Sequence, residues 1–335
     1  MIVTVTLSPA FDHLLFLPEI SLGKLNRAIS TLRMPGGKGI NLASSLAVLG
    51  EEVVTTGFLG GQGSRMFEEA LRKIGVTTSF TYIDQEIRTD FYIIEEKENR
   101  QSLLIEKGVS IELRYLNSFK ANFERLLPAA KLVEIGGSLP KGTTPDFIKE
   151  LVLSANKKKV KVVLNLRESI LKECLDSACL FIVCPDLRET CCVFGEDLRN
   201  SASRPKVAQE LLNKGAEIVI LKYGDLGYFV AKKDEAWEGE VEVGGSNVIM
   251  LGVRDGLLAG FIHNYMKTNN IGEALRFGLG AALSTSRSKM NYLNSKKQAE
   301  ELCLMANVRN VDELTSTTMH HSFRPFLPDF KSQKY

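Results

Sequence analysis

From about residue 111 onward, short apolar runs alternate with longer segments whose apolar residues recur at helical spacing. The apolar runs predict strands over residues 131–135, 160–164, 180–183 and 218–221. The longer segments predict helices over 111–127, from Thr144 to the lysines at 157–159, up to Leu175, and over 187–193, 206–213, 271–288 and 295–305. A regular alternation of this kind is typical of a parallel sheet covered by helices on both faces.

The N-terminal third instead carries short strand-like runs, most of which follow one another too closely for helices to intervene. Residues 1–7 are apolar, lack the basic start and cleavage site of a signal peptide, and predict a buried first strand. Runs at 13–17 and 27–32, with a second group at 79–83, 91–95 and 101–105, predict one small antiparallel flap. A strand is also expected at 53–56, followed by a helix over about 64–74.

Three glycines, a lysine and an asparagine are concentrated in the seven residues Pro35–Asn41, ahead of a helix-like run over 42–49. Glycine lets the backbone approach a ligand closely, and a helix start offers unpaired N–H groups and a positive dipole end. Lys38 adds a positive charge, so the stretch predicts a site for a polar, phosphorylated small molecule. A flexible turn with Lys38 in solvent is the alternative that these residues leave open.

Two other glycine-containing turns precede predicted helices. Residues 57–63 invite comparison with a dinucleotide-binding turn, but Met66 stands where the third glycine should be, which disfavours a nicotinamide-dependent oxidoreductase. In residues 248–261 an apolar strand-like run meets a turn and then a helix that opens at Asp255. That helix start is a second candidate anion site, although an aspartate in this position is more often only a cap.

Two charged side chains are placed where a ligand can be held. Asp12 follows the first predicted strand, at the sheet edge where open α/β sheets bind ligands, and a turn carboxylate is the alternative. Arg88 begins the middle strand of the second flap group. A guanidinium can grip a phosphate through two hydrogen bonds, and a solvated charge on the flap is the other interpretation.

Composition narrows the class of protein. The chain has 335 residues and a formal net charge of +2, and neither its charge nor its apolar runs predict a nucleic-acid or membrane partner. We expect one domain over residues 1–314 and an irregular tail over 315–335. Six cysteines, five of them within residues 174–192, lack zinc-ligand spacing and favour reduced, mostly buried thiols in a cytoplasmic protein.

Three stretches in chain order resemble the PfkB or ribokinase-like family of sugar kinases: residues 6–12, 36–41, and 252–255 with 259–261. The first two are most similar to the branch of 1-phosphofructokinases and tagatose-6-phosphate kinases. Residues 137–140 and 221–227 fit further family stretches, and the similarity extends to about residue 300. The resemblance implies a three-layer α/β/α sandwich with a mainly parallel central sheet and a small β-sheet lid, contributed by about 12–34 and 78–106, through which a homodimer can form.

The same resemblance implies ATP, Mg²⁺ and a ketohexose phosphate as substrate, with fructose 1-phosphate ahead of tagatose 6-phosphate. Asp255 takes the role of the family's catalytic base. The residues implied to bind substrate are Asp12, Gly37 and Asn41 at the sugar hydroxyls, and Lys38, Arg88 and Ser138 at its phosphate. Those implied for the nucleotide are Lys222, Gly224, Gly227, Gly252, Val253, Arg254 and Ser284, and those for the metal are Glu189 and Asp186.

The chain departs from the family pattern at two places. The family's Gly-Ala-Gly-Asp is Gly252-Val253-Arg254-Asp255 here, which puts a side chain where backbone should meet phosphate and a cation that should lower the basicity of Asp255. The usual Lys-Pro-Asn is Cys184-Pro185-Asp186, so a cation is missing there. The lysine missing at position 184 and the arginine gained at position 254 are consistent with one cation compensating for the other. They are equally consistent with a second function, a sugar-phosphate-binding sensor or scaffold that no longer transfers phosphate.

Overall fold

The structure is a computed structural model that describes residues 1–311 except 99, 176–177, 187–191 and 245–248. Within these residues the main sheet has eleven strands. Ten of them follow one another in the order β17-β16-β15-β14-β11-β10-β9-β1-β4-β5. The strands from β14 to β5 pair in parallel, whereas β15, β16 and β17 extend the sheet in antiparallel fashion. Their bounds are β1 Ile2–Thr6, β4 Val53–Gly60, β5 Thr77–Thr78, β9 Leu132–Gly136, β10 Lys161–Asn165, β11 Leu180–Val183, β14 Ala216–Lys222, β15 Gly227–Lys232, β16 Glu235–Glu240 and β17 Asn307–Asn310.

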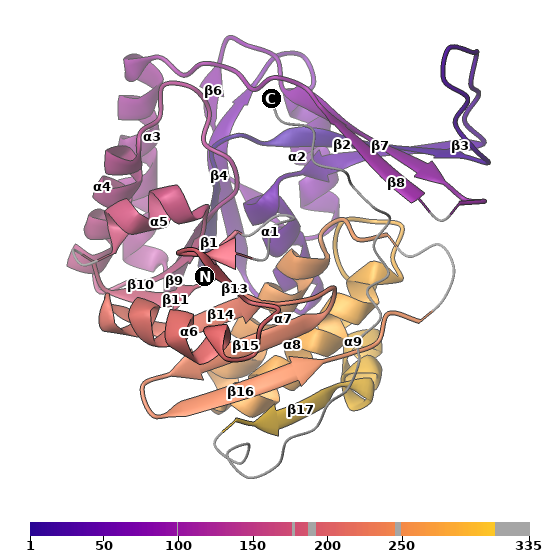
Figure 1. Ribbon diagram of the computed structural model, residues 1–335. Helices are drawn as coiled ribbons and strands as arrows, with labels where there is room; N and C mark the ends of the chain where they lie inside the picture. Colours follow the sequence, from indigo (N-terminus) through magenta and orange to yellow (C-terminus); the bar gives the residue numbers. More distant parts are fainter. Residues whose placement is uncertain (99, 176–177, 187–191, 245–248, 312–335) are drawn as a thin grey trace.

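Helices cover both faces of this sheet and make three layers (Figure 1). One helical layer consists of α1 Lys38–Val48, α2 Ser64–Lys73, α7 Val253–Thr268, α8 Ile271–Ser286 and α9 Lys296–Leu302. The other consists of α3 Leu113–Leu126, α4 Pro145–Lys157, α5 Glu168–Cys174 and α6 Ser203–Asn213. Alternate strand residues enter the two cores, as Leu132 and Val133 do, because successive side chains of a strand point to opposite faces. The expected α/β/α sandwich is confirmed.

A second sheet of four strands, which we call the lid, projects from the body (Figure 1). Its order is β3-β2-β7-β8, with β2 at Ala10–Leu17, β3 at Ser30–Gly36, β7 at Arg88–Glu95 and β8 at Arg100–Ile105. The lid ranges expected from the sequence were too broad, because β6, Thr81–Ile83, pairs with β4 in the main sheet. The lid is also not wholly antiparallel, since β2 and β7 run parallel.

Several other expectations about secondary structure and cysteine burial are wrong, because tertiary contacts overrode the local sequence pattern. A helix was expected over 187–193, but Cys192–Val193 is strand β12, paired with β13 at Glu196–Asp197, and 187–191 lie outside the described residues. The described part of the apolar run at 249–251 is not a strand, and β17, which is polar, was not foreseen. Of the five cysteines whose burial is described, only Cys174 and Cys184 are buried.

The cap predicted at Thr144 is confirmed, since its side chain accepts a hydrogen bond from the Phe147 N–H. Within the described residues, every helix is too short or too polar to cross a membrane. The tail expected over 315–335 lies outside the part of the chain that the structure describes.

Candidate active site

The N-termini of α1 and α7 meet at the carboxyl ends of the central parallel strands, where open α/β sheets bind ligands. The link between them is a hydrogen bond of 2.9 Å in which Asn41 Nδ2 donates to Asp255 Oδ2. These two residues are 214 positions apart in the chain and both are buried. Each helix start presents unpaired N–H groups and a positive dipole end. The junction where the two helix starts meet is therefore suited to an anion.

Glycine is required at both helix caps. Gly37 caps α1 with φ 117°, and Gly252 caps α7 in the left-handed region with φ 73°, where other residues are strained. A Cβ on Gly252 would also lie 2.0 Å from the backbone oxygen of Asn291. The glycines picked out in the sequence therefore shape the two helix starts on which the site is built.

Burial governs the ionisation of Asp255, whose side chain lies almost entirely out of solvent. Burial raises the pKa of this carboxyl, while Lys38, the hydrogen bond from Asn41 and Arg254 lower it, and the net direction is upward. Arg254 lowers the pKa of Asp255 as expected, but burial raises it by more. A carboxylate with a raised pKa holds a proton more strongly, which suits a general base.

Asp186 forms ion pairs with both cations of the site, Lys38 and Arg254. Its Oδ1 lies 2.6 Å from Lys38 Nζ and 2.9 Å from Arg254 Nη1, and all three side chains are largely buried. Burial lowers the pKa of Lys38, and Arg254 lowers it further, whereas Asp186 opposes the shift. Asp186 thus balances two positive charges that would otherwise repel each other beside the start of α7.

The guanidinium of Arg254 contacts the segment that follows β11. Its Nη2 donates to the backbone oxygens of Cys184, at 2.8 Å, and Pro185, at 2.5 Å, and contacts Cys184 Sγ at 3.3 Å. Arg254 lies in the first turn of the helix, and it is not among the described residues with positive φ. The arginine therefore fits without backbone strain and brings its charge beside residue 184, where the family pattern has a lysine.

The lid contributes Asp12, which lies on β2 and is buried. Asn291, from the segment between α8 and α9, donates through Nδ2 to Asp12 Oδ2 at 2.9 Å and to the Pro35 oxygen at 2.8 Å. Burial raises the pKa of Asp12 to about 7, and Asp90 adds to the shift while the bond from Asn291 opposes it. Gly36 must lack a side chain here, because its Cβ would overlap the Asp12 carboxylate.

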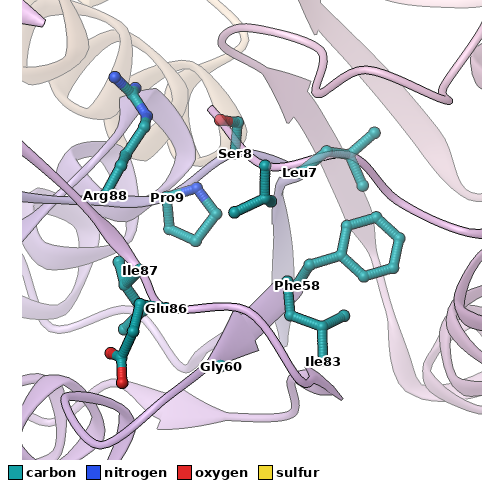
Figure 2. Close-up of a pocket in the computed structure, with 10 residues that line it drawn as sticks. Leu7, Ser8, Pro9, Phe58, Gly60, Ile83, Glu86, Ile87 and Arg88 are labelled. Carbon is teal, nitrogen blue, oxygen red and sulfur yellow. The ribbon is translucent and has the colours of Figure 1, made fainter. Parts of the chain in front are cut away.

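Arg88 and Ser138 lie at the edges of the same region. Arg88 begins β7, and Ser138 is half-buried two residues beyond the end of β9, next to Gly137, whose Cβ would lie 3.8 Å from that of Lys38. Figure 2 shows Arg88 and Ser8 at the rim of a mostly apolar cavity of about 20 Å³, with the Arg88 guanidinium turned away from it. A cavity of this size holds about one water molecule and no sugar.

Apart from Gly252, Val253 and Arg254 at the start of α7, the residues expected at the nucleotide lie at the turn between β14 and β15 and in α8. Lys222 ends β14 and begins the turn that the Tyr223 N–H closes onto the Gly227 oxygen at 2.9 Å. Gly227 leaves room for the Tyr223 ring, whereas Gly224 faces open space. Ser284 is buried in α8, where its hydroxyl donates to Gln298 Oε1 at 2.7 Å and accepts from the Asn294 N–H at 3.2 Å. Its contact with a nucleotide stays a prediction.

Two residues of the site were not singled out in the sequence. Asn291 fixes Asp12 from a distant segment, and no local pattern marks it. Glu134 lies fully buried on β9, where burial and nearby Asp255 raise the pKa of its carboxyl well above the ordinary value. An acidic residue inside an apolar strand was the one available signal for Glu134, because a charge is rarely buried without a purpose.

The site fits the phosphates of a nucleotide better than it fits a bare metal. Two helix N-termini, Lys38 and Arg254 converge near Asp255. Within the part of the chain that the structure describes, the buried Nε of Arg254 has no hydrogen-bond partner. No cluster of three potential metal ligands occurs among the described residues. Asp186 already faces two cations, and Glu189 lies outside the described residues. The described side chains therefore do not form a magnesium site by themselves.

Comparison with known proteins agrees with this geometry. Residues 6–297 match the model of the pfkB family carbohydrate kinases. A tagatose-6-phosphate kinase of Staphylococcus epidermidis is 27% identical over 307 residues, which span 89% of this chain and 96% of that protein. A crystal structure described as a possible 1-phosphofructokinase from Thermotoga maritima is 29% identical, with a TM-score of 0.85 over 92% of this chain and 99% of that one.

More distant structures share the fold. Phosphofructokinase-2 from Escherichia coli, in complex with substrates and products, has a TM-score of 0.82 at 21% identity over 90% of this chain and 98% of that one. The family matched consists of enzymes that transfer a phosphoryl group to a hydroxyl group. With the family model matching most of its length and the two helix N-termini meeting at Asp255, the chain belongs to the pfkB family of carbohydrate kinases.

Proposed function

We propose that this chain transfers the terminal phosphoryl group of ATP to a ketohexose phosphate, with fructose 1-phosphate as the first choice and fructose 1,6-bisphosphate as the product. The observation that carries the proposal is the Asn41–Asp255 hydrogen bond, which joins the N-termini of α1 and α7 around one buried carboxylate. The names of relatives at 27% and 29% identity support a phosphorylated ketose over a free sugar.

In the proposed mechanism Asp255 accepts the proton of the attacking sugar hydroxyl. Its raised pKa makes the ionised carboxylate a stronger base, and Asn41 holds it in one orientation. The N–H groups at the start of α7 stabilise the negative charge that develops on the transferred group. Magnesium bound together with the nucleotide phosphates would supply further charge neutralisation. Asp186 and Glu189 remain its proposed ligands.

Asp12, Gly37 and Asn41 are the proposed contacts for the sugar hydroxyls, and Lys38, Arg88 and Ser138 are those for the substrate's own phosphate. The Asn41 amide and the Asp12 carboxylate are both buried, and such groups discriminate strongly for hydroxyl groups, since an unpaired buried polar group is costly. Lys222, Gly224, Gly227, Gly252, Val253, Arg254 and Ser284 remain the proposed surroundings of the nucleotide.

The direct test is a coupled assay of ADP release with ATP and Mg²⁺. The acceptors are fructose 1-phosphate, tagatose 6-phosphate, fructose 6-phosphate, fructose and ribose. We expect saturable turnover on one phosphorylated ketose. Turnover on a free sugar alone would contradict the proposed substrate class.

The role of Asp255 is tested by Asp255→Asn, which keeps the size of the side chain and its contact with Asn41. Loss of the base should lower kcat by about 10²- to 10⁴-fold while sugar-phosphate binding, followed by calorimetry, changes little. Because protonated Asp255 cannot accept a proton, wild-type kcat should also fall as the pH drops through its raised pKa. Near-normal turnover by the variant would refute the assignment.

A binding protein without turnover is the second candidate. The observation that favours it is the pairing of the Asp186 carboxylate with both Lys38 and Arg254. This pairing leaves less of their positive charge to bind the phosphates of a nucleotide. Thermal-shift binding of a sugar phosphate without ADP release on any acceptor would support this candidate. The intact arrangement of Asp255, Asn41 and the two helix starts favours the enzyme.

We also propose that the chain forms a homodimer through the lid. Three consecutive lid residues, Leu103, Leu104 and Ile105, are 45–58% exposed, and the loop between β2 and β3 exposes Leu22, Leu25 and Ile29 by 64–88%. Apolar residues gathered on one projecting sheet are typical of a surface that another chain covers. A related structure is described as the tetrameric inhibited form of phosphofructokinase-2 from Escherichia coli.

A further inference from the structure

The arginine proposed to hold the substrate phosphate already has an anionic partner. Arg88 Nη1 lies 2.5 Å from Asp90 Oδ1, and the two side chains are only 13% and 8% exposed. The buried Nε of Arg88 has no hydrogen-bond partner among the described residues. Arg88 is therefore held by a carboxylate while part of its donor capacity remains unused.

The strand geometry of the lid explains this pairing. Residues 88 and 90 are two apart on β7, so their side chains point to the same face of the lid. The parallel register between β2 and β7 sets Asp12 opposite Asp90. Two acidic side chains and one arginine thus share a small, mostly buried patch next to the site.

Other charged and titratable groups around Asp90 reinforce this imbalance. On β7, Tyr92 lies on the same face of the lid, and burial raises its pKa, so that it stays neutral. Glu106, just beyond β8, donates its backbone N–H to the Asp90 carboxylate, and its own carboxylate accepts from the Thr89 N–H at 2.7 Å. Burial raises the pKa of Asp90, and Arg88 opposes the shift. Among the described residues that act on Asp90, acidic groups therefore outnumber the one cation, Arg88.

We propose that Asp90 is a built-in competitor of the substrate's phosphate for Arg88, and that its charge sets how tightly the site binds a phosphorylated acceptor. The inference rests on the proposed function, in which Arg88 contacts that phosphate. In the free protein Asp90 is the carboxylate that pairs directly with the buried Arg88 guanidinium. An arriving phosphate dianion shares the guanidinium with Asp90 and is repelled by its negative charge, so Asp90 takes up a proton as the sugar phosphate binds.

The proposal is tested with Asp90→Asn, which removes the negative charge but keeps an oxygen that accepts from Arg88. Calorimetry without nucleotide measures the binding of fructose 1-phosphate and tagatose 6-phosphate, with fructose and tagatose as the uncharged counterparts. At pH 8 we expect the variant to bind a sugar phosphate about tenfold more tightly than the wild type, with no change for the free sugars. The gain should shrink at pH 6, because wild-type Asp90 is more readily protonated there.

Two further variants make the result interpretable. Asp90→Ser also removes the charge and should change affinity in the same direction, even if one of the two variants folds poorly. Asp84→Asn is the matched control, since Asp84 is 79% exposed in a surface ion pair with Arg114 and should have no effect.

Equal or weaker sugar-phosphate binding by both Asp90 variants would overturn the proposal and leave Asp90 as a residue that only orients Arg88. That outcome is distinct from failure of the proposed function, which would appear as a wild-type protein that neither binds nor turns over any sugar phosphate. Binding gained by the variants supports the competitor role whether or not the wild type shows turnover.

Discussion

At the scale of single residues, Asp12 combines a proposed role in sugar binding with a cost to the folded protein. Its pKa is raised from 3.8 to about 7, so the ionised carboxyl is disfavoured in the folded state relative to the unfolded chain. The contribution of this group to stability therefore falls as the pH rises from about 4 to 7 and stays low above that. The shift corresponds to about 4 kcal/mol at most.

We predict that Asp12→Asn raises the free energy of unfolding at pH 8 by about 2–4 kcal/mol, since the amide oxygen can still accept from Asn291. The difference from wild type, measured by urea unfolding, should close as the pH falls toward 4. Sugar binding should weaken in the same variant. Asp234→Asn, at an exposed position, is the control, and a pH-independent difference would contradict the assigned pKa.

At the scale of elements, Arg254 ties the start of α7 to the segment after β11. Its contacts with Asp186, Cys184 and Pro185 hold together two segments that are about 70 residues apart in the chain. Removing one partner of a buried ion pair usually costs about 3–5 kcal/mol, because a charge is left without a counter-ion. Lys38 remains beside Asp186 and should reduce that cost.

We predict that Arg254→Ala lowers the free energy of unfolding by about 2–3 kcal/mol and raises the KM for ATP severalfold. Arg254→Lys keeps the charge but reproduces few of the contacts, so it should recover part of the ATP affinity and less of the stability. Urea unfolding and ADP-release kinetics measure the two effects. Tighter ATP binding by Arg254→Ala would show instead that the arginine obstructs the nucleotide.

At the scale of the whole molecule, the lid both borders the candidate site and presents exposed leucines. Arg88 lies on β7, which pairs with β8, where Leu103 and Leu104 face solvent in the single chain. Asp12 lies on β2, at the other side of β7. A partner that covers this surface would therefore also steady the strands that carry two proposed substrate contacts.

We predict that Leu104→Glu shifts the protein toward monomer, with a dimer dissociation constant raised at least about tenfold, because a buried charge at an interface is costly. Light scattering after size exclusion measures the change. Leu304→Glu is the control, since Leu304 is 80% exposed but lies after α9, away from the lid. A monomeric wild-type protein would rule out the proposed dimer.

Local chemistry in the sequence was enough to predict the sandwich, the cap at Thr144 and the two helix starts. Apolar periodicity and glycine placement act over a few residues, so a linear pattern contains them. The same pattern misassigned Cys192–Val193 as helix and missed the polar strand β17, which is held by its pairing with Glu238 and its neighbours in β16. The lid boundary was also drawn too broadly, because strand register depends on partners far along the chain.

The sequence by itself determined the family, the layered fold and the types of residue in the site. Only the tertiary structure decided how these residues act on one another: Asn41 on Asp255, Asn291 on Asp12, Asp90 on Arg88, and Asp186 between Lys38 and Arg254. The physical reason is that burial and opposing charge set the strength of a base or a phosphate contact. Both depend on residues that fold together from distant parts of the chain.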